Sequence, residues 1–124
     1  MAYEVFKRTV ARVDTPTVAI VPNGIIAINA AAVRLFKDAR ISSVLLLWDE
    51  KNRRMALKAS QKKDRNAYAV SFSEGRSGSL RAKSFFAHIG WKGLKRERLS
   101  ATWNEKELML EVTLPLENLK PRVD

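Results

Sequence analysis

Short apolar runs separated by turn-forming residues predict a chain built mainly from strands. The clearest turn is Pro22-Asn23-Gly24, because Asn and Gly adopt the left-handed backbone that tight hairpins need. The run at 44–48 is unbroken, which predicts a strand covered on both faces. Alternating or β-branched apolar positions predict the other strands, which we expect at 3–13, 17–21, 25–28, 55–59, 68–72, from 80, at 99–103 and at 108–114.

Two segments have helical rather than strand periodicity. Asn29 is a good N-cap for a short helix at 30–36, with Ala32, Val33 and Phe36 on the inward face. The second helix is expected at 82–89 and ends at Gly90, a residue suited to a left-handed C-cap.

The order of these elements occurs twice, which predicts an internal repeat of two ββαββ units at 18–60 and 67–114, joined by a charged linker at 61–66. Trp48-Asp49-Glu50-Lys51 aligns with Trp103-Asn104-Glu105-Lys106 at an offset of 55, and we expect both tryptophans in the core. Ile28-Asn29-Ala30 aligns with Leu80-Arg81-Ala82 at an offset of 52, so the three-residue difference falls in the helix-to-strand loop. We therefore expect an α+β, mostly β domain spanning 1–124, in which the two units dock about a pseudo-twofold axis.

Charge narrows the choice of partner. Of 124 residues, 23 are Lys or Arg and 13 are Asp or Glu, giving +10, and residues 61–100 alone carry ten basic and three acidic groups. A basic excess of this size in a short chain favours a polyanionic partner such as nucleic acid. No cysteine, signal peptide or membrane-length apolar run is present, so we expect a cytoplasmic protein with no membrane partner.

The residues most suited to contact nucleic acid are basic clusters and one adjacent tryptophan. Phosphates would be met by the Lys and Arg groups, and Trp91 either stacks on a base or closes the end of the second helix. The candidate residues are Arg53, Arg54, Arg76, Arg81, Lys83, Trp91, Lys92, Lys95, Arg96 and Arg98.

The first unit resembles the AbrB family of bacterial transcription regulators and antitoxins, including its tandem MraZ type. The positions that carry the resemblance are Asn23-Gly24, Ile26, Ile28, Arg34, Val44, Leu46, Asp49 and Leu57, whereas Ile25 stands where the family usually has a polar residue. The resemblance implies a swapped-hairpin barrel, a homo-oligomer and DNA binding through basic residues of the first hairpin and nearby loops. A Whirly-type single-strand-binding fold has a similar element order and is the alternative.

Residues suited to catalysis or metal binding are sparse. His88 is the single histidine, and Asp49-Glu50 and Glu105-Lys106-Glu107 lie in expected hairpin turns rather than in a metal-ligand pattern. We expect no enzyme activity, catalytic residue, metal or cofactor. Two further interpretations remain: a structural or protein-interaction module that self-assembles through its sheets, and a binder of single-stranded DNA or RNA.

Overall fold

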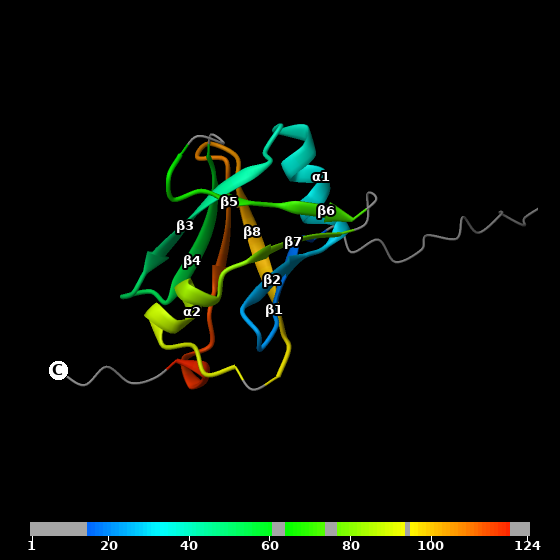
Figure 1. Ribbon diagram of the computed structural model, residues 1–124. Coiled ribbons are helices and arrows are strands. Elements are labelled where there is room, and N and C mark those ends of the chain that lie inside the picture. Colours follow the sequence, from blue (N-terminus) through cyan, green and yellow to red (C-terminus); the bar gives the residue numbers. More distant parts are fainter. Residues whose placement is uncertain (1–14, 61–63, 74–76, 94, 120–124) are drawn as a thin grey trace, which may run out of the picture.

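The computed structural model describes residues 15–60, 64–73, 77–93 and 95–119. These residues form nine strands and two α-helices, with a short 3-10 turn near the end (Figure 1). The strands are β1 (Thr17–Ile20), β2 (Ile25–Ile28), β3 (Ser43–Asp49), β4 (Arg54–Ala59), β5 (Tyr68–Ala69), β6 (Ser71–Ser73), β7 (Ser77–Arg81), β8 (Glu97–Asn104) and β9 (Met109–Thr113). The helices are α1 (Ala30–Asp38), α2 (Lys83–Ile89) and the 3-10 helix η1 (Leu116–Asn118). The mostly β prediction is confirmed; the expected strand at 3–13 lies outside the described residues.

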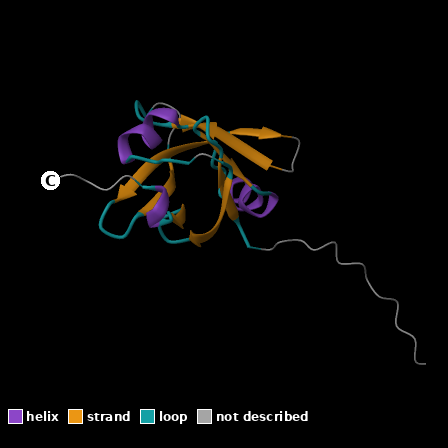
Figure 2. Cartoon of the chain, turned by 90° about the horizontal axis from the view of Figure 1, so that it is seen from below, coloured by secondary structure: helices purple, strands orange, loops and turns teal. Residues whose placement is uncertain are grey.

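All nine strands belong to one antiparallel sheet, in the order β5-β3-β4-β9-β8-β1-β2-β7-β6. Its two outermost strands, β5 and β6, are consecutive in the chain and are separated by Val70 alone. The segment 68–73 therefore joins the two ends of the sheet, which curves into a nearly closed barrel. Figure 2 shows the strands curving, with helical segments at the rim.

The first helix begins where the sequence predicts. Oδ1 of Asn29 accepts hydrogen bonds from the backbone N–H of Ala32 and of Thr17, each 3.0 Å long. One side chain thus caps α1 and fixes the start of β1 to it. Ala32, Val33 and Phe36 are buried, as expected from their helical spacing.

The core fills the inside of the barrel, and it corrects two expectations. Only alternate residues of a barrel strand point inward, so β3 is not covered on both faces, and Leu47 remains 39% exposed. Trp48 and Trp103 are half-buried rather than fully in the core. They pack at its margin, Trp48 edge-on to Phe85 and Trp103 tilted against Phe36.

The single strand expected at 68–72 is also wrong in detail. It divides at Val70, whose N–H donates to the carbonyl oxygen of Ser42 at 3.0 Å. The division follows from the topology: residues 68–69 pair with β3, and residues 71–73 pair with β7. Of the expected linker 61–66, residues 64–66 form a turn closed by Asp64, and the remainder lies outside the described residues.

Candidate nucleic-acid interface

One end of the barrel collects segments that are far apart in the sequence. Ile20 at the end of β1 pairs with Glu97 at the start of β8, and Ile25 at the start of β2 pairs with Arg81 at the end of β7. The start of β4 and the end of β9 meet at the same end, away from the turn 105–108. We call this region the basic end; of the described residues it comprises 21–25, 50–54, 81–83, 90–93 and 95–98 (Figure 1).

Most of the predicted contact residues lie at this end. Seven of them are exposed basic residues, and Arg53 is half-buried. The seven are Arg54, Arg81, Lys83, Lys92, Lys95, Arg96 and Arg98. Arg76 lies outside the described residues. The barrel thus groups positive charges that come from three separate segments of the chain, at 50–54, 81–83 and 90–98.

A close backbone contact holds two of these segments together. Gly24 has a φ of 87°, and a Cβ placed on it would lie 2.5 Å from the Cα of Lys83. Its carbonyl oxygen accepts a hydrogen bond from the N–H of Ala82 at 2.8 Å. Only glycine permits both the left-handed turn and this approach, so the predicted Asn-Gly turn also positions the start of α2 and its Lys83.

Trp91 begins the loop that follows α2, and its ring packs against that helix rather than projecting into solvent. Its ring is half-buried and lies 6.0 Å from Phe86, centroid to centroid, with its nitrogen beneath Gly93. That nitrogen is buried with no hydrogen-bond partner in the described part of the chain. The next residue, Lys92, donates its N–H to the carbonyl oxygen of Asn118 at 2.6 Å, which ties the loop to η1. This arrangement matches the helix-closing role that the sequence allows for Trp91.

The acidic group next to the arginines is already engaged. Oδ2 of Asp49 accepts a 2.8 Å hydrogen bond from Nδ2 of Asn52, and Oδ1 accepts a 3.3 Å bond from the Asn52 N–H. These bonds, together with the charge of Arg54, hold the pKa of Asp49 below its ordinary value. They also shape the turn that leads to Arg53, whose φ is 54°.

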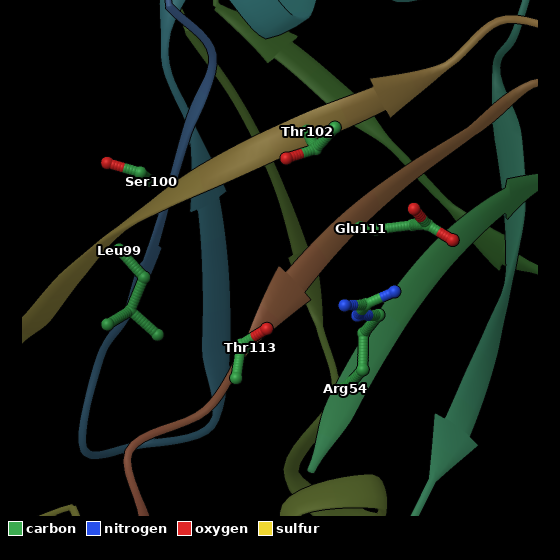
Figure 3. Close-up of a pocket in the computed structure, with 6 residues that line it drawn as sticks. All are labelled: Arg54, Leu99, Ser100, Thr102, Glu111 and Thr113. Atoms are coloured by element: carbon green, nitrogen blue, oxygen red, sulfur yellow. The ribbon is translucent and has the colours of Figure 1, made fainter. Parts of the chain in front are cut away.

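A shallow polar groove of about 230 Å³ borders the basic end on the outer face of the sheet. In Figure 3 the guanidinium of Arg54 points toward the carboxylate of Glu111 on the neighbouring strand. The groove is lined by Arg54, Leu99, Ser100, Thr102, Glu111 and Thr113. Of these residues only Arg54 was predicted as a site residue; the i, i+2 spacing of Ser100 and Thr102 along β8, and of Glu111 and Thr113 along β9, is the signal that places these four on one face.

The described residues contain no cluster of three or more His, Asp or Glu side chains that could hold a metal ion. No helix among them is long and apolar enough to cross a membrane. Comparison of the chain with protein-family models, curated proteins and solved structures gives no match.

Proposed function

We propose that the chain is a non-enzymatic nucleic-acid-binding protein that meets the phosphate backbone with its basic end. The observation that carries the proposal is the convergence of seven exposed Lys and Arg side chains from three segments onto one end of a small barrel. A compact group of cations attracts a polyanion and releases its condensed counterions on binding.

The turn 105–108, at the opposite end of the barrel, has no excess of positive charge. It carries Glu105 and Glu107, and the latter forms a 2.9 Å ion pair with Lys58. Positive charge is therefore denser at the basic end than at this turn, which favours approach of the nucleic acid to the basic end. Because Trp91 is packed against Phe86, and no described aromatic side chain of the basic end is exposed, base stacking contributes little. Duplex DNA is the favoured ligand, ahead of single strands and RNA.

We further propose that the barrel is a fused pair of ββαββ units related by a pseudo-twofold axis. Two reciprocal hydrogen bonds support this: Ala59 N–H to Leu108 oxygen at 2.9 Å, and Leu114 N–H to Arg53 oxygen at 2.8 Å. Adding 55 to the number of Ala59 gives Leu114, and subtracting 55 from that of Leu108 gives Arg53. The two hydrogen bonds therefore exchange equivalent residues of the two units.

Helix ends supply a second, independent correspondence. The N–H of Ile41 donates to the oxygen of Phe36, and the N–H of Trp91 to that of Phe86, at an offset of 50 in both residues. Each bond follows a left-handed residue, Arg40 or Gly90. A duplicated barrel of this kind is what the resemblance to AbrB and MraZ regulators implies, so we propose a DNA-binding regulator acting in the cytoplasm. The Whirly-type fold stays the alternative.

Fluorescence anisotropy with a labelled DNA duplex over a salt series tests the function. We compare a Lys92→Ala, Lys95→Ala, Arg96→Ala triple variant with a control triple variant, Arg34→Ala, Lys37→Ala, Lys106→Ala, which removes the same charge from exposed sites elsewhere. The slope of log affinity against log salt should fall by about 2.7 in the first variant, at about 0.9 per lost phosphate contact.

The control should retain the wild-type slope. Equal effects of the two triple variants, or no binding by the wild type at low salt, contradict the proposal. Competition with the same sequence as single-stranded DNA and as RNA then decides which ligand is preferred.

A further inference from the structure

Strand β3 has an open edge along most of its length. On the side away from β4 it pairs with β5 only at Ser43 and Val44, and no described strand lies beside its remaining residues there. The Ser42 oxygen already faces this side, since it accepts the Val70 N–H. Because backbone groups alternate along an antiparallel strand, Leu46 and Trp48 direct their N–H and C=O groups toward the open edge.

An apolar groove of about 800 Å³ runs beside this edge, between β3, α2 and residues 65–68. Leu45, Leu47, Trp48, Phe85 and Ile89 supply its apolar lining. Its charged or titratable lining residues are Arg65, His88 and Tyr68, and none of the residues lining it is acidic. An occupant that fits must therefore be an extended strand with alternating apolar side chains and an acidic group.

The edge lacks the usual protection against strand pairing. Proteins guard such edges with lysine, proline or a bulge, yet residues 45–48 read Leu-Leu-Leu-Trp and keep a regular register with β4. The matching positions on β8 differ. There Ser100 and Thr102 point outward where β3 has Leu45 and Leu47, so exposure of apolar groups is specific to β3.

We propose that the β3 edge is a homodimer interface, in which β3 pairs antiparallel with β3 of a second copy around a twofold axis at Leu47. The strand that the groove requires is β3 itself: Leu45 and Leu47 are its alternating apolar groups, and Asp49 follows them. Leu46 of one copy would exchange backbone hydrogen bonds with Trp48 of the other, twice per dimer.

Charge complementarity selects this occupant. Asp49 lies at the end of the pairing segment, and in the antiparallel arrangement it approaches the end of the second copy's groove where Arg65 lies. The hydrogen bonds from Asn52 leave the Asp49 carboxylate ionised, because they lower its pKa. A basic strand from another protein would have no such partner. The pairing residues 45–49 adjoin the basic end without being part of it, so dimerisation and nucleic-acid binding are tested by different substitutions.

Sedimentation velocity over a concentration series tests the dimer. Leu47→Asp places two like charges next to each other on the axis and should weaken the dimer at least about a hundredfold. Thr102→Asp is the matched control, since Thr102 is the exposed residue at the corresponding position of β8, and it should leave the dimer intact. A wild-type chain that remains monomeric at its highest soluble concentration overturns the proposal and leaves the edge to a strand of another protein. Equal effects of the two substitutions overturn it as well.

Cross-linking tests the register without weakening the fold. The chain has no cysteine, so Leu47→Cys introduces a single thiol. In a non-hydrogen-bonded antiparallel pair the two Cα atoms lie about 4.5 Å apart, within the range of a disulfide. Mild oxidation should convert Leu47→Cys mainly to a covalent dimer and leave Thr102→Cys monomeric. No excess of cross-linking at position 47 contradicts the proposed axis.

Discussion

The β3–β4 and β8–β9 hairpins have the same backbone conformation at their turns but expose different side chains. In each, a side-chain oxygen at the first turn position accepts from the N–H three residues later: Asp49 from Asn52, and Asn104 from Glu107. Each turn then ends in a left-handed residue, with φ of 54° at Arg53 and 51° at Leu108. Their outward residues are unlike, since β3 exposes Leu47 where β8 exposes Thr102.

The features that the two hairpins share form the barrel, whereas the residues in which they differ lie on the two proposed binding surfaces. The turn oxygen, the left-handed residue and the inward apolar positions are common to both hairpins, and they suffice for the shared backbone. The tip of one hairpin carries Arg53 and Arg54, and the tip of the other carries Glu105 and Glu107. We therefore attribute the two proposed binding surfaces to residues that the barrel itself does not require.

The largest effect is expected where the two hairpins join. Leu57 and Leu110 pair across β4 and β9 and are both fully buried. Replacement of either by Ala should lower the free energy of unfolding by about 2–5 kcal/mol, because each leaves a cavity in a packed core. Urea denaturation should give similar losses for the two, whereas Leu108→Ala, at a 38% exposed site, should change stability by less than about 0.5 kcal/mol. A loss below about 1 kcal/mol at either position would contradict the close packing inferred for this junction.

Reversing the charges at the tips of the hairpins should change the affinity for DNA and leave the free energy of unfolding nearly unchanged. Lys51 and Arg54 are exposed basic residues of the first tip. Lys51→Glu with Arg54→Glu should weaken binding of a DNA duplex roughly tenfold or more at low salt, since two positive groups of the basic end become negative. Glu105→Lys with Glu107→Lys, at the far end, should change affinity by less than about threefold. Anisotropy measures both, with unfolding curves as the control. A larger effect from the second pair would place the binding surface at the opposite end.

The left-handed turn residues should respond differently to glycine. Leu108→Gly removes the steric cost of a Cβ at positive φ and should stabilise the protein by roughly 0.5–1 kcal/mol. Arg53→Gly relieves the same cost but loses a half-buried side chain, so its gain should be smaller or absent. Thermal unfolding distinguishes the two, and a destabilised Leu108→Gly variant would contradict the interpretation of this turn.

The smallest expected effect is a difference in acid sensitivity. Asp49 has a pKa below its ordinary value because the ionised carboxylate accepts hydrogen bonds from Asn52. Its stabilisation is complete above roughly pH 5 and disappears as the pH falls through the lowered pKa. Asp49→Asn should remove this part of the pH dependence, as Asn104 already lacks it. Unfolding measured between neutral and acidic pH would refute this if the variant and the wild type lost stability in parallel.

Local signals were sufficient for much of the fold. Asn29 was recognised as a helix cap, Pro22-Asn23-Gly24 as a hairpin turn and Gly90 as a helix end, because each depends on backbone conformation and hydrogen bonds within a few residues. The segment 68–72 was misjudged, since its division at Val70 depends on two different pairing partners, β3 and β7. The apolar run of β3 was misjudged for a related reason: periodicity does not reveal which face a closed sheet leaves uncovered.

For the candidate site, the sequence alone determined which residues are basic and which turns they flank. Only the tertiary structure decided that Arg54, Arg81 and Lys95 share one end of the barrel, because strand pairing between distant segments brings them there. The same pairing leaves the edge of β3 open. The charge of each side chain can be read from the sequence. Which charged side chains lie close together depends on hydrogen-bond registers between distant strands, and no short stretch of sequence contains that information.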